Sequence, residues 1–368
     1  MAADHSDAPQ SAIAKREKFR PAVKIVAALL YVVMFLVLAE VVLRLFADFD
    51  GAGPGAVREP LYSQEELRRD LQRYSERQGG DCITVRTGLY WDPRFGFASK
   101  KLNKACAHKL FAAHKTSVVL MGGSAMDNAQ APNYLTSIDT YAFGNDPSIA
   151  SLNLAESGAR HSNMLFRFLH EVLELHPTYA VFLDGFNEFN SVRYGGAPED
   201  DFYWTAGVKD RVEHPLLFFR NKLVDSSRLL ELLALKTGII NSARIVRTHV
   251  DPRLAIQSAE YYVKTRAYTD TICKAYGIKC IFIMQPTALL DKTPSESAKW
   301  AVQQDLRSFR SDIDIYQTGY DYILSKAGNE VLDATHLFDG KGDVYLDVVH
   351  FNKLGSKLIG GYIRAALH

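Results

Sequence analysis

The sequence predicts an α/β fold in which a parallel sheet carries helices on both faces. From residue 116 onward, short runs rich in Val, Ile and Leu alternate with stretches of helical pattern, as expected for parallel strands joined by helices. Each apolar run ends in a polar cluster. The chain has 368 residues, of which 47% are hydrophobic and 23% charged, so it can bury one large core or two domains.

Residues 117–121 form the first predicted strand, an apolar run that stops at two glycines and a serine. Further strands are predicted at 150–154, 179–183 and 279–284, and helices at 163–175, 258–276, 297–324 and after His350. The strands end in Gly-Gly-Ser, Ala-Glu-Ser-Gly, Asp-Gly-Phe-Asn-Glu and Gln-Pro-Thr. Because the carboxyl ends of parallel strands line one edge of a sheet, where ligands bind, we expect these clusters to be neighbours in space.

The N-terminal part of the chain predicts a membrane anchor. Residues 1–21 are polar and are expected to form a cytoplasmic tail, and residues 22–46 a single transmembrane helix. The apolar run within it, residues 25–46, would be about 33 Å long as a helix, enough to cross the hydrocarbon core of a bilayer. Only Glu40 and Arg44 interrupt it, and their spacing lets them pair on one face or reach the lipid headgroups.

Basic residues are unevenly distributed around this run. Five of them precede it, whereas none follows it until Arg58. The positive-inside rule therefore predicts a single-pass membrane protein with a cytoplasmic N-terminus and a periplasmic or extracellular domain. A cleaved signal peptide is the alternative, but the apolar run is longer than such peptides usually carry, which favours a retained anchor in the lipid bilayer.

The four cysteines fit an exported domain, where disulfides can form. Three connectivities are possible. Pairing Cys82 with Cys106 and Cys273 with Cys280 closes the shortest loops. Four unpaired thiols are the alternative.

Between the anchor and the sheet, residues 47–62 are rich in Gly and Pro and predict a linker, so that 63–368 would be the exported domain. A helix is predicted at 63–76, and an irregular segment or edge strand at 83–97. From about 194 to 250 the alternation lapses, which predicts an insertion with its own amphipathic helix. Its apolar face could pack on the core, close over the site as a lid, or face the bilayer.

Ser124 follows the first strand and is expected where that strand gives way to a helix. A hydroxyl there lies at the carboxyl edge of the sheet, beside backbone N–H groups that can stabilise negative charge. The loop could bind an anion, or Ser124 could act as a nucleophile. The phosphate-loop interpretation is the weaker one, since no Gly-Lys-Ser/Thr follows.

A serine nucleophile needs a base and a group that orients the base. Near the C-terminus, Asp347 and His350 are three residues apart, so on a turn the carboxylate can hold the imidazole while its other nitrogen faces Ser124. The same spacing is also common in structural roles. Asn187 and Gly158 follow other strands and could donate N–H groups to an oxyanion, although both also suit ordinary turns.

Taken in this order, Gly123-Ser124, the glycine at 158, Gly185-Phe-Asn187 and Asp347-Val-Val-His350 resemble the four motif blocks of the SGNH hydrolases, also called GDSL-like esterases. The resemblance covers residues 115–368. It implies a three-layer α/β/α sandwich, related to the flavodoxin-like arrangement. It also implies that Ser124 is nucleophile and first oxyanion donor, Gly158 the second donor, Asn187 the third, and His350 the base, oriented by Asp347.

The sequence departs from that family's pattern at two positions. The first block, which ends at Ala125 and Met126, reads Gly-Gly-Ser-Ala-Met instead of Gly-Asp-Ser, so the usual acidic neighbour of the serine is missing. Glu188 stands where Asp commonly follows the Asn. Neither change removes a catalytic role. His161 lies close behind Gly158 and is expected to be a helix-start or surface residue.

The resemblance implies a serine esterase or O-acyltransferase acting on an extracytoplasmic ester, with an envelope polysaccharide as one such substrate. The sequence leaves hydrolysis and transfer both open. A rival hypothesis is a binding or assembly subunit that docks on an integral membrane partner protein. With 43 basic and 42 acidic residues the chain has no footprint for nucleic acid. No residue group has metal-ligand spacing, and this chemistry needs neither metal nor cofactor.

Overall fold

The computed structural model describes residues 26, 28–39, 82–92, 94, 96–127, 138–144, 146–193, 197–199, 216, 251–309 and 313–368. The chain divides into two compact units, Met1–Arg58 with His214–Arg244 and Glu59–Glu213 with Ile245–His368. The predicted tail at 1–21, linker at 47–62 and helix at 63–76 lie outside the described residues. So does the predicted insertion at 194–250, apart from 197–199 and 216.

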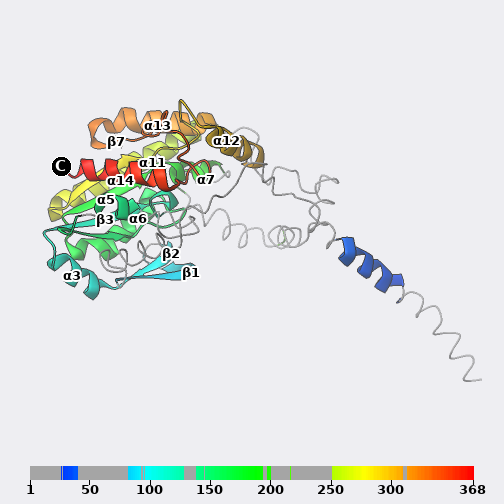
Figure 1. The fold of residues 1–368 in the computed structure, drawn as a ribbon, viewed down its shortest axis with the longest axis horizontal. Helices are drawn as coiled ribbons and strands as arrows, with labels where there is room; N and C mark the ends of the chain where they lie inside the picture. Colours follow the sequence, from blue (N-terminus) through cyan, green and yellow to red (C-terminus); the bar gives the residue numbers. More distant parts are fainter. Residues whose placement is uncertain are drawn as a thin grey trace, which may run out of the picture. The chain divides into compact units, whose positions relative to one another are not determined.

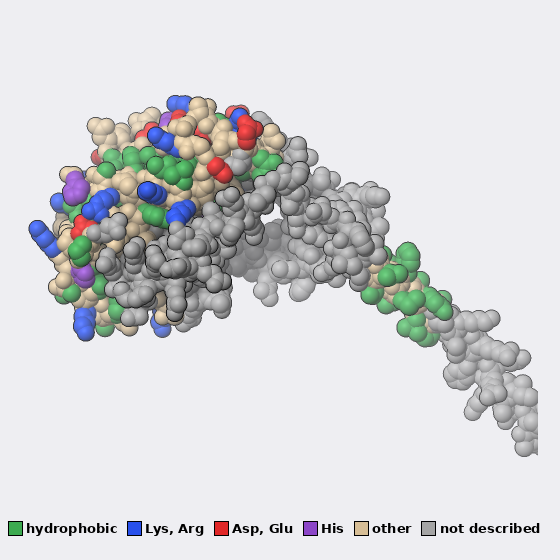
Figure 2. Space-filling view, viewed as in Figure 1, with side chains coloured by type: hydrophobic (Ala, Val, Ile, Leu, Met, Phe, Trp, Pro, Cys, Tyr) green, Lys and Arg blue, Asp and Glu red, His purple; other side chains and the backbone are tan. Residues whose placement is uncertain are grey.

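In the first unit, Val26 and residues 28–39 are helical, within the predicted transmembrane helix at 22–46. Their large apolar side chains, from Val26 to Leu38, are between 43% and 69% exposed. Figure 2 shows this helix covered with hydrophobic side chains. Among the residues that the structure describes, no helix combines the length and the hydrophobicity needed to span a bilayer.

The second unit is built on a five-stranded parallel sheet with the order β4-β3-β5-β6-β7. Its strands are β3 (Thr116–Gly122), β4 (Ile149–Asn153), β5 (Tyr179–Asp184), β6 (Lys279–Met284) and β7 (Leu332–Asp333). The four predicted strands are confirmed to within one residue at each end. β3 is flanked by β4 on one side and β5 on the other, so the strand order reverses there. In open parallel sheets, ligands bind at the carboxyl edge beside such a reversal.

Helices cover both faces of this sheet. The ring of Phe182 on β5 lies 5.1 Å from that of His161, which begins α6 (His161–Arg167). Side chains alternate between the two faces of a strand, so Tyr179 points the other way. Its hydroxyl donates to Leu367 O, just past α14 (Lys353–Ala366). The unit is therefore a three-layer α/β/α arrangement, as expected from the sequence.

Two groups of helices form the outer layers. On one side α14 packs on α5 (Ile138–Phe143), so closely that a Cβ at Gly360 would lie 2.9 Å from the Tyr141 Cβ. On the other side α11 (Pro252–Tyr276) packs against α6 and α13 (Ile313–Ala327). Figure 1 shows α11 and α13 next to each other in yellow and orange.

Several elements differ from the sequence expectation. The predicted helix at 163–175 is α6 followed by a π-helical turn (Phe168–Val172) and a 3₁₀ turn (Leu173–Leu175). The helix predicted at 258–276 begins at Pro252, because Asp251 caps it by accepting from Arg253 N–H and proline suits a first helical position. In place of one helix at 297–324, the structure has α12 (Glu296–Phe309) and α13.

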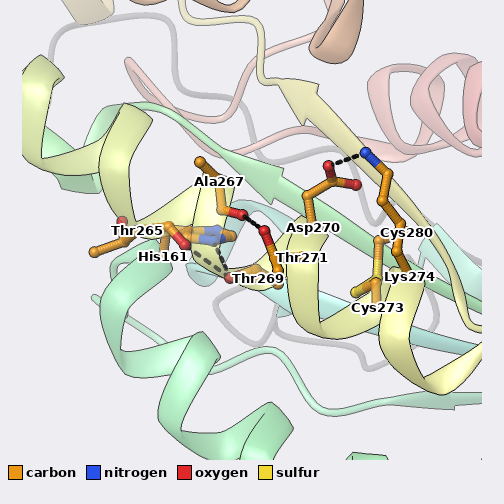
Figure 3. Close-up of a disulfide and its surroundings, with 9 residues drawn as sticks. All are labelled: His161, Thr265, Ala267, Thr269, Asp270, Thr271, Cys273, Lys274 and Cys280. Atoms are coloured by element: carbon orange, nitrogen blue, oxygen red, sulfur yellow. Dashed lines mark hydrogen bonds and ion pairs between the residues drawn. A yellow bond between two sulfur atoms is a disulfide. The ribbon is translucent and has the colours of Figure 1, made fainter.

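The segment predicted as irregular or edge strand at 83–97 belongs to a hairpin of β1 (Ile83–Asp92) and β2 (Gly96–Leu102), followed by α3 (Lys104–Ala112). Disulfide Cys82–Cys106 joins the start of this hairpin to α3, with the two Cα atoms 5.1 Å apart. Disulfide Cys273–Cys280 joins the end of α11 to β6 (Figure 3). The pairing with the shortest loops is therefore the one present.

Candidate active site

Ser124 lies where β3 turns into the short helix α4 (Ser124–Asp127). The turn is tight. Gly122 has a φ of +148°, and a Cβ there would lie 2.4 Å from Leu183 O on the neighbouring strand, so only glycine fits. The N–H groups of Met126 and Asp127 donate back to Gly123 O at 3.1 and 3.0 Å. These bonds fix the serine at the edge of the sheet, with its side chain 6% exposed.

Asn187 meets the Ser124 turn directly. Its Nδ2 donates to Ala159 O at 3.0 Å, and its Oδ1 accepts from Asn190 Nδ2 at 2.9 Å, which together fix the orientation of the amide. A Cβ on Gly123 would lie only 2.1 Å from this Nδ2. The glycine before the serine is therefore needed for the amide to approach the backbone of the Ser124 turn.

Gly158 lies in a third segment that contacts the Ser124 turn. It is the third residue of a turn closed by a hydrogen bond from Ala159 N–H to Glu156 O at 3.1 Å, and its φ is +72°. Glu156 N–H in turn donates to Gly122 O at 3.0 Å. The turns that carry Ser124, Gly158 and Asn187 are thus in mutual contact, although they come from the ends of three different strands.

Asp347 and His350 form a pair on a tight turn. Asp347 Oδ2 lies 2.6 Å from His350 Nδ1, and Oδ1 accepts from the N–H groups of Val349 and His350, both at 2.8 Å. Burial alone would raise the pKa of Asp347. The hydrogen bonds from His350 and Val349 outweigh the effect of burial, so the pKa lies below its ordinary value. An ionised Asp347 requires a proton on Nδ1 and leaves a lone pair on Nε2.

The turn that carries this pair is attached to the end of β6. Val348 O accepts from the hydroxyl of Thr287 at 2.7 Å and from Ala288 N–H at 2.9 Å. Thr287 belongs to the Gln-Pro-Thr cluster that follows β6. The sheet order β3-β5-β6 puts this attachment at the same edge as Ser124 and two strands away from it, about 10 Å across the sheet.

The predicted residues therefore lie in two groups. One consists of the contacting turns of Ser124, Gly158 and Asn187, and the other of the Asp347–His350 pair. His350 Nε2 is buried and has no hydrogen-bond partner among the described residues, so no hydrogen bond joins it to Ser124. Such bonds are often long in structures without substrate and shorten only in the complex.

Sequence reasoning missed the buried charges behind these turns. Glu188 is 1% exposed, and its Oε1 accepts from His161 N–H at 2.7 Å. Its Oε2 lies 3.6 Å from Nε of the equally buried Arg160. Burial and the neighbouring carboxylate of Asp184 raise the pKa of Glu188, against the lowering effect of Arg160. Glu188 stood out in the sequence only as a departure from the family pattern.

The expectation for His161 was partly wrong. It does begin a helix, but its side chain is fully buried. Nδ1 lies 2.8 Å from Asp184 Oδ2, and Nε2 lies 2.9 Å from the hydroxyl of Thr269 on α11, as Figure 3 shows in part. These contacts account for both ring nitrogens and make His161 a structural link between β5 and α11. No group of three or more metal-ligating side chains occurs in the described part of the chain.

Comparison with protein-family models finds no match, and no curated protein matches the sequence. Solved structures do show similarity. A GDSL-like lipase from Bacteroides thetaiotaomicron aligns with a TM-score of 0.38 and 14% identity over 72% of this chain and 97% of its own. A putative acylhydrolase from Bacteroides fragilis gives 0.38 and 13% over 69% and 86%. An acetylxylan esterase from Geobacillus stearothermophilus gives 0.34 and 12% over 68% and 94%.

Proposed function

We propose that this chain is a serine ester hydrolase or O-acyltransferase of the SGNH type. Ser124 is the nucleophile, His350 the base and Asp347 the residue that orients the base. The N–H groups of Ser124 and Gly158 and the side chain of Asn187 form the oxyanion hole. The observation that carries the proposal is the contact between the turns of these three donors at the edge of the sheet. It is supported by the buried Nε2 of His350, which has no hydrogen-bond partner within the described ranges.

In the proposed reaction, Ser124 Oγ attacks the carbonyl carbon of an ester while its proton passes to His350 Nε2. The carbonyl electrons move onto the oxygen, where the three donors stabilise the negative charge. The bond from the carbonyl carbon to the alcohol oxygen then breaks, and that oxygen takes the proton from Nε2. An acyl group is left on Ser124.

The same machinery resolves this intermediate with either of two acceptors. His350 Nε2 takes a proton from water in hydrolysis, or from a hydroxyl of a second molecule such as a sugar in transfer, as that oxygen attacks the acyl carbon. The bond from this carbon to Ser124 Oγ then breaks, and Oγ takes the proton from Nε2. An acetylated polysaccharide outside the cytoplasm is the substrate class that we propose. Measuring released acetate together with newly acetylated glycan in one assay separates the two reactions. Transfer is contradicted if added acceptor glycan leaves the ratio of acetylated glycan to released acetate unchanged.

We also propose that residues 22–46 anchor the protein in a lipid bilayer, with the catalytic domain outside the cytoplasm. Two observations support this proposal. The apolar side chains of Val26 and residues 28–39 are exposed over all faces of the helix, and both cysteine pairs of the catalytic unit form disulfides. The protein should stay with membranes through a high-salt and carbonate wash, and its release by that wash would contradict anchoring.

A fluorophosphonate probe tests the catalytic assignment, because it reacts with an activated serine. The full chain in detergent should be labelled at Ser124 and should cleave a simple acetyl ester. Ser124→Ala should lose both properties, whereas the control Ser325→Ala, an exposed serine on α13 bonded only within its own helix, should keep them. Ester turnover that survives in Ser124→Ala would refute the assignment. A wild-type chain that is neither labelled nor active, but co-purifies with membrane proteins, would favour the rival assembly function.

A further inference from the structure

The segment that carries Gly158 is held at both ends by buried carboxylates, each paired with a buried arginine. At the first end, Glu156 accepts from Ser99 N–H at 2.8 Å and Lys100 N–H at 2.9 Å on β2, and from Arg167 at 2.5 Å. At the second end, Glu188 accepts from His161 N–H and faces Arg160. The side chains of Glu156, Glu188, Arg160 and Arg167 are all at most 2% exposed. Burying four charges is costly, so we expect these ion pairs to hold the segment in a defined position.

Glu188 differs from Glu156 because it belongs to the opposite side of the proposed oxyanion hole. It follows Asn187 directly in the chain, while its side chain binds the backbone at His161, three residues past Gly158. The side chain of Asn187 binds the same segment, by donating to Ala159 O. Two neighbouring side chains therefore fix the position of the Gly158 turn relative to the Asn187 amide.

Arg160 completes this connection from the other direction. Its guanidinium lies beside Glu188 and donates to the hydroxyls of Ser191 at 3.3 Å and Ser258 at 3.4 Å. The Ser258 hydroxyl itself donates to Glu188 O at 2.6 Å. The backbone and the side chain of Glu188 are both held, so little freedom remains between the two segments.

We propose that Glu188 is a positioning residue, which sets the separation between the Gly158 N–H and the Asn187 amide by holding the segments of both together. The proposal rests on the proposed function, since it concerns the oxyanion hole of that reaction. Glu188 touches neither the substrate nor Ser124. Its effect reaches the reaction through the alignment of two donors, and alignment of such donors matters in the transition state more than in the bound substrate.

Glu188→Gln is the informative variant, because glutamine has the same size but only one acceptor oxygen. Glutamine can still accept from His161 N–H, but its NH2 group then lies where the carboxylate oxygen faces Arg160 Nε at 3.6 Å, so the ion pair is lost. We expect kcat for an acetyl ester to fall about tenfold while KM stays within about twofold, as for a lost transition-state interaction. The control is Glu330→Gln, which also removes a carboxylate paired with a buried arginine, Arg266, but outside the segments that carry Gly158 and Asn187. It should keep kcat within about twofold.

A double-mutant cycle with Asn187→Ala distinguishes positioning from general support of the fold. Asn187→Ala alone should lower kcat by about 10² to 10³. If Glu188 acts through the oxyanion hole, adding Glu188→Gln to Asn187→Ala should lower kcat by much less than the tenfold loss seen in the wild-type background. If Glu188→Gln does not fold, Glu188→Asp takes its place. The shorter side chain keeps its charge but cannot reach His161 N–H, and the same loss and coupling are expected.

Two results would overturn the inference. One is a kcat of the Glu188 variant within about twofold of wild type, and the other is losses that simply multiply in the double variant. Either result leaves the proposed function intact as long as Ser124→Ala is inactive. An active Ser124→Ala variant would instead remove the function on which the inference rests.

Discussion

Gly123 illustrates how a single residue decides what the site can be. Its lack of a side chain lets the Asn187 amide lie where a Cβ would be only 2.1 Å away. The sequence shows two glycines before Ser124, but it does not show which group packs against them. That partner comes from 64 residues further along the chain, and only the pairing of β3 with β5 brings it there.

Asp139 on α5 is a residue whose burial should be visible in the pH dependence of stability. Desolvation raises the pKa of Asp139, and Lys100, Asn153 and backbone N–H groups offset this only in part, so that the resulting pKa is about 6. The folded state then binds a proton more tightly than the unfolded state does. Between the unfolded pKa near 4 and the folded pKa, stability therefore falls as pH rises, and above that range it is level.

This sign gives a measurable prediction for Asp139→Asn. From pH 4.5 to pH 7.5 the wild-type protein should lose about 2 kcal/mol of unfolding free energy relative to the variant. Urea titrations at the two pH values measure this difference. A difference that does not change with pH, or that grows in favour of the wild type, would show that Asp139 does not titrate as its burial requires.

At the scale of elements, strands were the most predictable part of this chain. The runs that became β3, β4, β5 and β6 are apolar on both faces, because helices cover both sides of the sheet. β7 has only two residues, Leu332 and Asp333, too few to give a periodic signal. α3 was missed because only Ala107 and Phe111 of its nine residues are buried, so its apolar face is very narrow.

The turn from Tyr345 to Phe351 is the element on which the proposed base depends. It is attached to the end of β6 through Val348 O, and the buried hydroxyl of Thr287 is one of the two donors to that oxygen. Loss of one buried hydrogen bond of this kind is worth about 1 kcal/mol.

We expect Thr287→Val, which has the same shape without the hydroxyl, to lower kcat about fivefold through misplacement of His350. Thr287→Ser keeps the hydroxyl and should retain most of the activity. Steady-state kinetics with an acetyl ester compares the three proteins. An equal loss of kcat in both variants would point to packing at this position. An unchanged kcat in Thr287→Val would show that the hydroxyl does not position His350.

At the scale of the whole molecule, the sequence predicted that polar clusters would be neighbours at one sheet edge, and the turns of Ser124, Gly158 and Asn187 are in contact there. It did not predict what lies behind them. Ser124, Gly158, Asn187, Asp347 and His350 could be chosen because each follows a strand or forms a recognisable spacing. Arg160 and Glu188 could not, since a charged residue in a polar cluster gives no sign of being buried. Only the docking of α11 over β5 makes that cluster part of the interior.

The two disulfides allow a prediction about the stability of the whole unit. Cys82–Cys106 closes the longer loop, with a sequence separation of 24 against 7 for Cys273–Cys280. Removing it as Cys82→Ala with Cys106→Ala should cost about 3.5 kcal/mol by loop entropy, and removing the other pair about 2.5 kcal/mol. Urea unfolding under non-reducing conditions measures both. The reverse order would mean that the native contacts of the cysteines, and not the loops, set the effect.

β5 is hydrogen-bonded on both sides, to β3 and to β6, and Asn187 follows it by three residues. The Asp347–His350 turn lies outside the five-stranded sheet and is joined to the end of β6 through Val348 O, while Val349 and His350 are buried. Amide protons around β5 should therefore exchange with deuterium only when the entire unit opens, whereas those of the turn can exchange in small excursions that leave the sheet intact. A protein built this way can move its proposed base for brief intervals while the proposed oxyanion donors stay in place.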